Sequence, residues 1–184
     1  MFVSRTWIGA AVAACALALG ACGDDSSDTG QTVPPPPGNG VDRAFINAVL
    51  PLHEKAVAVA IIAKKRGNSY VRELASKIAA SQPQETARLR GIGGALFAAG
   101  VPVGTTGVPA TDAADVVDLK RLRSVRPFED AFLKAMIPLH EATIALCKAE
   151  IAKGDQVDLK TTAQAMIDTE SSQLTSMRKR QKNA

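Results

Sequence analysis

An internal repeat is the feature of this sequence that most constrains its fold. Shifting the 184-residue chain by 87 positions places residues 44–58 on residues 131–145, and eight of these 15 positions are identical. The shared residues include a Pro-Leu-His-Glu string that ends at Glu54 in the first copy and at Glu141 in the second. Two copies with so long a period are too few for a solenoid. The repeat therefore predicts a duplicated unit that packs against its own copy.

Each copy has the apolar spacing of an amphipathic helix, followed by a second helix. Apolar residues recur three and four positions apart and predict one inward-facing stripe per copy: Phe45, Val49, Leu52, Ala56, Val59 and Ala63, and Phe132, Met136, Leu139, Thr143 and Leu146. Gly67 and Gly154 are expected C-cap residues. Asp155 as an N-cap and Pro127 in a first turn mark two helix starts. We expect helices over 42–66, 69–90, 126–153 and 156–181.

Two helical hairpins predict an all-α fold, in which they close into a four-helix bundle. The folded domain is expected over residues 42–181, with repeats over 42–91 and 126–181 and a crossover over 92–125. A short extra helix is expected over 112–122 within the crossover. Aromatic residues make up only 4% of the chain. The core must therefore be built from Ala, Leu, Ile and Val, whose small side chains suit closely packed helices.

The N-terminal residues are typical of a bacterial lipoprotein. Arg5 precedes an apolar run from Trp7 to Leu19, which is shorter than a membrane-spanning helix and matches the core of a signal peptide. The run ends in Leu-Gly-Ala-Cys, which resembles a lipobox and predicts cleavage of residues 1–21 and lipidation of Cys22. The alternative is an ordinary signal peptide followed by a chance cysteine.

Residues 22–41 are expected to carry the lipid and to form a disordered tether. Asp, Ser, Thr and Gly precede the prolines at 34–37, and almost nothing in the segment is apolar enough to bury. At least two acyl chains on one cysteine give stable anchoring. We therefore expect an extracytoplasmic domain that is lipid-anchored to the cell membrane or the outer membrane.

The charge of the chain points to no nucleic-acid partner. The formal net charge is only +4. Much of the basic excess lies near the end of the last expected helix, where cations complement the helix dipole. These residues are Arg178, Lys179, Arg180 and Lys182.

Polar residues on otherwise apolar helix faces mark the candidate chemistry. A histidine stands at the margin of each first-helix stripe, and each second helix carries two polar residues three positions apart on its apolar face. Each half would thus offer one imidazole, one carboxylate and one carboxamide to the interior, a set that can hold a divalent transition metal. The residues are His53, Gln82 and Glu85 in the first half and His140, Glu170 and Gln173 in the second.

Two sulfur-bearing residues extend this candidate site. Met136 lies one turn before His140 and Cys147 lies two turns after it, so both could add soft ligands that favour copper. Cys147 could instead be a small buried hydrophobic residue.

Other roles for the same polar residues stay open. A structural network would hydrogen-bond across the core and fix the register of the helices. An enzyme is not indicated, because the sequence has no Cys-x-x-Cys and no nucleophile elbow. The Glu-x-x-His motif of di-iron bundles is also missing, since Leu50 and Ile137 stand three residues before the histidines.

The segments from Asp42 to Glu54 and from Phe128 to Glu141, with the Gln and Glu three apart in each second helix, resemble domain-of-unknown-function family 305. The resemblance covers about residues 42–181. It implies a ferritin-like four-helix domain in an exported protein, often linked to copper binding or metal tolerance. The family motif usually reads Pro-His-His, whereas Leu52 and Leu139 replace its first His here, and Val59 and Leu146 replace a later Met.

The residues and the resemblance together lead to one main hypothesis. The protein would be a lipid-anchored, extracytoplasmic metal-binding protein, for copper or another divalent ion, and a binder rather than an enzyme. The alternative is a metal-free structural or protein-interaction module of the cell envelope with a degenerate metal site. The sequence identifies no protein partner.

Overall fold

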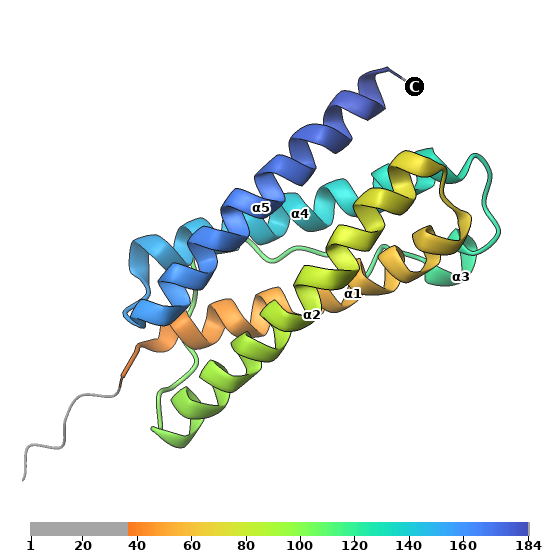
Figure 1. The fold of residues 1–184 in the computed structure, drawn as a ribbon. Helices are drawn as coiled ribbons and strands as arrows, with labels where there is room; N and C mark the ends of the chain where they lie inside the picture. The colour runs from red at the N-terminus through yellow and green to blue at the C-terminus, as the bar shows by residue number, and fades with distance from the viewer. Residues whose placement is uncertain (1–36, 184) are drawn as a thin grey trace, which may run out of the picture. The chain divides into compact units, whose positions relative to one another are not determined.

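The computed structural model describes residues 37–183, and within this range every regular element is a helix (Figure 1). The helices are α1 (Gly40–Arg66), α2 (Ser69–Ala98), α3 (Leu119–Leu122), α4 (Phe128–Lys153) and α5 (Val157–Lys182). The predicted all-α bundle is therefore confirmed. The predicted signal peptide, the lipidated Cys22 and most of the tether lie outside the described residues.

Helices α1 and α4 form the centre of the bundle. Helix α1 packs against α2 and α4, and α4 packs against α5, whereas α2 and α5 meet over a short length (Figure 1). The two predicted stripes are buried along their whole length, with Phe45, Val49, Phe132 and Met136 completely enclosed. Helix α1 is long and apolar enough to cross a membrane, but half of its most apolar window is buried in the bundle. It is therefore the core helix of this domain.

The first helix of each hairpin ends with the same backbone geometry. The C-cap Gly67 has φ −69° and ψ 158°, and the C-cap Gly154 has φ −70° and ψ 159°. Neither glycine is left-handed, so the reason for glycine here is space. A Cβ on Gly154 would collide with the carboxyl groups of Glu150 and Asp42, and one on Gly67 would collide with the side chain of Val71.

Helix α2 extends beyond its predicted boundary. We expected the helix to end at residue 90 and the crossover to begin at 92, but α2 continues through the glycines at 91–94 to Ala98. Leu89 and Leu96 are both buried and continue the apolar face seven positions apart. Their burial offsets the weak helix propensity of glycine. The extra crossover helix is shorter than the predicted 112–122, because α3 covers only its last four residues.

Three helix starts also differ from prediction. Helix α4 begins at Phe128 instead of 126, so Pro127, which was expected in its first turn, is its N-cap residue. The N-cap of α5 is Gln156 instead of Asp155, and its side chain accepts a hydrogen bond from the amide three residues further on, at 2.6 Å. Helix α1 begins at Gly40, inside the expected tether, because the side chain of Asn39 accepts hydrogen bonds from two amides of the first turn.

The crossover, residues 99–127, is attached to α1 at both ends. Near its start, the amide of Gly104 donates to the carbonyl of Gly40 at 2.8 Å. Near its end, the guanidinium of Arg66 donates to the carbonyls of Leu122 at 2.7 Å and Val125 at 2.9 Å. The long connection between the hairpins is thus part of the packed domain.

Two buried carboxyl groups, which the sequence did not single out, lie where α1 begins and α4 ends. Asp42 accepts hydrogen bonds from the amides of Asn39, Asp155 and Gln156, so it joins the start of α1 to the α4–α5 turn. Glu150 is fully buried against it. Burial, together with the hydrogen bond and charge of Asp42, raises the pKa of Glu150 to about 8. A protonated Glu150 can donate to Asp42.

We expect Glu150→Gln to make the stability of the domain less dependent on pH. The raised pKa means that folded Glu150 keeps a proton that the unfolded chain releases near its usual value of 4.5. The free energy of unfolding should therefore fall as the pH rises from about 4.5 through about 8. Urea unfolding at several pH values should show this fall in the wild type and a smaller one in Glu150→Gln, which becomes the more stable protein above pH 8.

The exposed Glu73→Gln provides the control for this prediction. Among the described residues, Glu73 pairs with Lys77 on the surface. Lys77 lowers the pKa of Glu73, so its replacement should leave the pH dependence above about pH 4.5 as in the wild type. Parallel pH profiles for wild type and Glu150→Gln would contradict the assignment of a proton to Glu150.

Candidate metal centre

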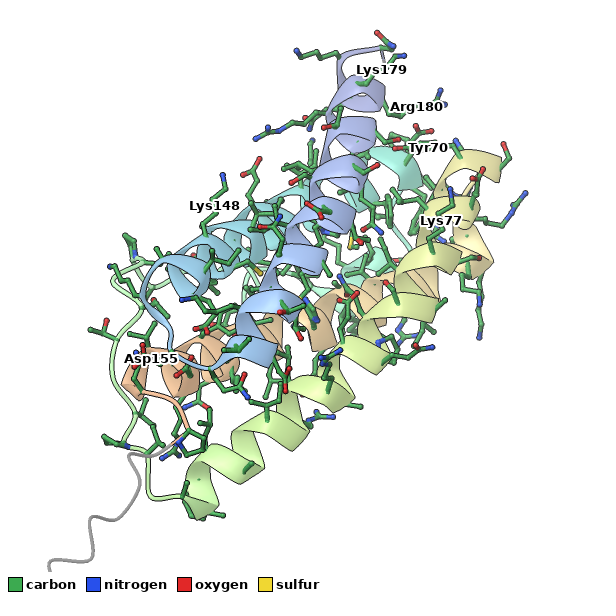
Figure 2. All side chains as sticks on the ribbon, turned by 60° about the vertical axis from the view of Figure 1, so that its left-hand side comes forward. Tyr70, Lys77, Lys148, Asp155, Lys179 and Arg180 are labelled. Carbon is green, nitrogen blue, oxygen red and sulfur yellow. The ribbon has the colours of Figure 1, made fainter. Side chains whose placement is uncertain are left out.

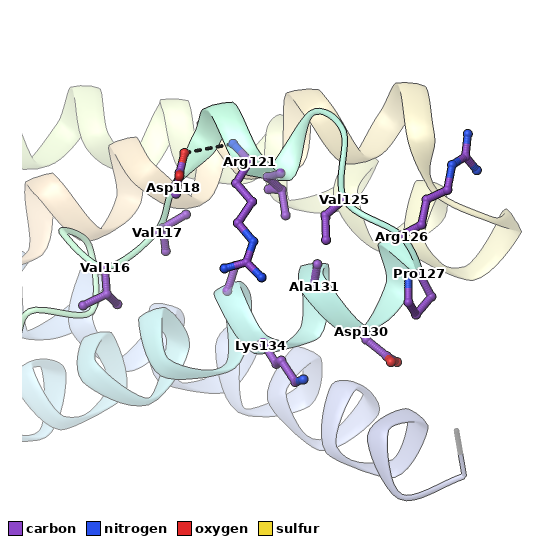
Figure 3. A pocket seen from close by; sticks show the side chains of 12 residues that line it. Val116, Val117, Asp118, Arg121, Val125, Arg126, Pro127, Asp130, Ala131 and Lys134 are labelled. Atoms are coloured by element: carbon purple, nitrogen blue, oxygen red, sulfur yellow. Dashed lines mark hydrogen bonds between the residues drawn. The ribbon is translucent and has the colours of Figure 1, made fainter.

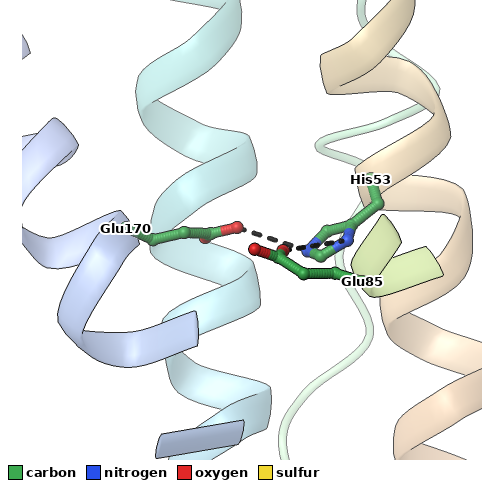
Figure 4. A group of neighbouring side chains, drawn as sticks. All are labelled: His53, Glu85 and Glu170. Atoms are coloured by element: carbon green, nitrogen blue, oxygen red, sulfur yellow. Dashed lines mark ion pairs between the residues drawn. The ribbon is translucent and has the colours of Figure 1, made fainter. Parts of the chain in front are cut away.

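A cluster of ionisable side chains lies inside the bundle, where helices of both hairpins approach one another. His53 comes from α1, Glu85 from α2 and Glu170 from α5 (Figure 4). His53 Nδ1 lies 3.8 Å from Glu85 Oε2, and His53 Nε2 lies 3.3 Å from Glu170 Oε1. One possible ligand atom from each residue lies within 4.8 Å of the other two. We call these three residues the acidic half-site.

The acidic half-site is more deeply buried than the sequence indicated. His53 was expected at the margin of its stripe, but it is 0% exposed. Helix α2 packs on α1 beside the α1–α4 contact, and Glu170 reaches His53 from α5, so a marginal position on one helix becomes an interior position in the bundle. Helix α2 continues through Pro83, and Gln82 and Glu85 both reach the cluster.

The acidic half-site places two carboxyl groups beside one imidazole, with His53 and Glu170 buried and the Glu85 side chain 22% exposed. Burial is the main cause of a raised pKa at Glu85; the charge of Glu170 adds to the rise, and the charges of His53 and His140 oppose it. Among the described residues, five enclosed polar atoms of this region have no hydrogen-bond partner. They are His53 Nδ1 and Nε2, Gln82 Oε1, Glu85 Oε2 and Glu170 Oε2. Buried polar atoms normally have a partner, and a bound cation would supply one.

One hydrogen bond at the cluster connects the two hairpins. Gln82 Nε2 donates to Glu170 Oε1 at 3.1 Å, from α2 to α5. A shift of 88 residues makes these two positions equivalent in the repeat, so the bond joins corresponding points of the two halves. The same helices also meet where α2 begins and α5 ends. There the hydroxyl oxygen of Tyr70 lies 3.1 Å from Ser176 Oγ, and the guanidinium of Arg180 lies over the ring of Tyr70 (Figure 2).

The second histidine has different surroundings. His140 Nδ1 lies 3.1 Å from the backbone carbonyl oxygen of Met136, and His140 Nε2 lies 2.8 Å from Gln173 Oε1. Both ring nitrogens therefore lie beside neutral groups. A neutral imidazole can donate from Nδ1 to the Met136 carbonyl and accept at Nε2 when the carboxamide of Gln173 turns its NH2 group towards the ring. We call His140 and Gln173 the neutral half-site. It has the features of the structural polar network that the sequence left open.

Cys147 lies in the core and has the properties of an inert thiol. It is completely buried and unpaired among the described residues. Burial, followed by the charges of Glu170 and Glu85, raises the pKa of the thiol far above its usual range. Cys147 has the burial of a small hydrophobic side chain and does not belong to the group of His53, Glu85 and Glu170.

The described surface also has hollows, and they lie apart from the acidic half-site. One, of about 400 Å³, lies between α3 and α4, and the side chain of Arg121 points across it towards α4 (Figure 3). Another, of about 770 Å³, lies between α1, α4 and the crossover. No residue of the acidic half-site lines either one. The cluster is thus separate from both hollows; its His53 and Glu170 side chains are buried, and that of Glu85 is 22% exposed.

The fold and the site together define the class of protein: a helical bundle of two equivalent hairpins with a His-Glu-Glu cluster in its interior. The chain belongs to the DUF305 family, a domain of unknown function, whose family model matches residues 42–180. The resemblance seen in the sequence is therefore confirmed. No curated protein matches the sequence significantly.

Solved structures share this fold. The Cu(I)-bound form of CopM superimposes on this chain with a TM-score of 0.65 at 22% sequence identity, and the match covers 77% of this chain and 96% of the CopM chain. The apo form of CopM gives 0.63 at 20% identity, with the same coverage. A DUF305 fragment from Deinococcus radiodurans gives 0.61 at 20% identity, covering 81% of this chain and all of the fragment. At such identities the similarity establishes the fold.

We expect Glu85→Gln to stabilise the metal-free domain. The substitution removes one of two carboxylates that share a buried imidazole, while it keeps the size of the side chain. The free energy of unfolding in chelator at pH 8 should rise by on the order of 1 kcal/mol. Glu54→Gln, at an exposed position paired with Arg90, should change it much less. A less stable Glu85→Gln variant would mean that the carboxylate is already compensated in the metal-free protein.

Proposed function

We propose that this protein binds a metal ion within its helical bundle, as a lipid-anchored protein on the outer side of a membrane. The observation that carries the metal proposal is the group of five unpartnered polar atoms around His53, Glu85 and Glu170. Enclosed polar atoms without partners destabilise a folded protein. One cation could bind one of the two ring nitrogens of His53 together with carboxylate oxygens of Glu85 and Glu170.

The residues present fit a metal ion by their chemistry. Imidazole nitrogen and carboxylate oxygen are common ligands of divalent transition ions and of copper(II). Two ligand atoms that each lie about 2.1 Å from one ion are at most about 4.2 Å apart. The ligand atoms of His53, Glu85 and Glu170 lie within 4.8 Å of one another, so a small movement of the side chains would bring them into binding distance. His53, Glu85 and Glu170 would hold the ion. Gln82 would position Glu170 through the hydrogen bond between them.

The other predicted site residues would act from outside the ligand set. His140 is held by Gln173 and by the backbone of Met136, so it borders the site and shapes its surroundings. A bound ion would add stability and connect both hairpins through one centre. The protein would act as a binder, and the residues of the site suggest no catalytic step.

Two further observations support the proposal. CopM, which shares the fold, has been solved in Cu(I)-bound, Cu(II)-bound and silver-bound forms. In this chain, the apolar run before Leu-Gly-Ala-Cys supports export and lipidation at Cys22. The domain would then bind metal outside the cytoplasm. A metal-free structural or interaction module of the envelope is the second candidate, favoured by the fully partnered neutral half-site.

We expect a bound ion to raise the melting temperature by several degrees, and His53→Ala and Glu170→Gln to abolish the rise. Ligand binding to the folded state alone stabilises it by about 2.7 kcal/mol at a free concentration 100 times Kd. The full chain, purified in mild detergent and stripped with chelator, can be melted with and without Zn(II) or Cu(II). Glu54→Gln, next to His53 but exposed, should keep the rise. An unchanged melting temperature with every ion would favour the metal-free module.

We also expect Cys22→Ala to release the protein from the membrane fraction. The substitution removes the thiol that would carry the lipid but leaves residues 37–183 unchanged. Cell fractionation and labelling with a radioactive fatty acid should show labelled, membrane-bound wild type and an unlabelled variant. Equal labelling of both proteins would refute the assignment of Cys22. This result would leave the metal proposal intact, because the two rest on different residues.

A further inference from the structure

The repeat places carboxylates and carboxamides at exchanged positions in its two halves. Glu85 corresponds to Gln173, and Gln82 corresponds to Glu170, when the second helices are aligned with a shift of 88 residues. Because the second helices of the two hairpins meet at the cluster, both carboxylates face the first histidine. The second histidine receives a carboxamide instead. Of these four equivalent positions, the two that carry a carboxyl group therefore both lie at the first histidine.

The two half-sites also differ in how many of their atoms have partners. In the acidic half-site, neither nitrogen of His53 has a hydrogen bond, and Glu85 and Glu170 each keep a buried oxygen without one. In the neutral half-site, both nitrogens of His140 are within 3.1 Å of an oxygen. An ion at the acidic half-site would bind one nitrogen of His53 and carboxylate oxygens that have no partner, whereas ligation by His140 would replace a contact that already exists.

The donor atoms of the acidic half-site suit one charge class of metal. Two carboxylates balance the charge of a divalent ion, but leave a net negative charge in the core beside a monovalent ion. The donors are one imidazole nitrogen and carboxylate oxygens, with the carboxamide oxygen of Gln82 beside them. Such donors suit divalent ions such as zinc and manganese, whereas copper(I) prefers thiolate and thioether sulfur.

We propose that the acidic half-site takes one divalent transition ion through His53, Glu85 and Glu170 and discriminates against copper(I) and silver(I), while His140 stays outside the ligand set. This inference rests on the proposed metal function and specifies its ion. Copper would then be held only as copper(II). In this the chain would differ from CopM, whose solved forms include Cu(I) and silver.

The duplication provides a matched pair of variants for the test. His53→Gln and His140→Gln change equivalent residues of the two copies, and both replace a buried imidazole by a polar side chain of similar size. The full chain in detergent is titrated without oxygen with Zn(II), Mn(II), Cu(I) and Ag(I), each at a buffered free concentration. Stoichiometry, Kd and melting temperature are measured for each ion. If His53→Gln folds poorly, Glu170→Gln is used in its place to test for the loss of metal affinity.

We expect one Zn(II) per chain, a Kd at least about tenfold weaker in His53→Gln, and little change in His140→Gln. Copper(I) and silver(I) should bind more weakly than Zn(II) and raise the melting temperature less. Tighter binding of Cu(I) or Ag(I), or an equal loss in both histidine variants, would overturn the inference but leave a metal-binding protein. Failure of every ion to bind more tightly to the wild type than to Glu170→Gln would instead refute the proposed function itself.

Discussion

The packing of α1 against α4 along two equivalent apolar stripes is the constraint on which the rest of the structure depends. Each stripe leaves the flank of its helix to be covered by the second helix of a hairpin, and the repeat makes both flanks alike. The polar side chains next to the stripes are therefore drawn into the interior together. An imidazole and two carboxylates would be costly there in isolation. Their convergence turns three separate costs into one region that a single cation can compensate.

Most of the fold could be predicted from the sequence, because the repeat and the spacing of apolar residues independently indicate the same helices. The stripes and the two C-cap glycines followed from spacing alone. The end of α2 did not, because the glycines at 91–94 indicate a break while Leu89 and Leu96 continue the buried face. Packing decided between these two signals. Glu150 was also overlooked, although it lies four residues after Leu146, the last residue of the predicted α4 stripe, and could have been found by extending that spacing.

The candidate site could be predicted only in part. The sequence placed two histidines and four carboxyl or carboxamide groups inside the bundle, and the structure places both carboxyl groups at His53 and one carboxamide at His140. That division depends on which face of α2 meets which face of α5, a property of the assembled bundle that the spacing within one helix does not contain. For the same reason, the position of His53 at the margin of its apolar stripe gave too low an estimate of its burial. Met136 contacts the site through its backbone carbonyl, which no argument from side-chain chemistry would have found.

The carboxylate of Asp42 has a consequence for how the domain carries mechanical load. It binds amides at the start of α1 and in the α4–α5 turn, so the point where the chain enters the domain is fastened to both hairpins. A pull applied through the preceding segment would be shared between them and would not peel α1 away turn by turn. His53 lies eleven residues further along α1, roughly 16 Å away. Along α1, the hydrogen bonds of Asp42 thus lie between the entry of the chain and the interior cluster, and would take up such a pull before it reached His53.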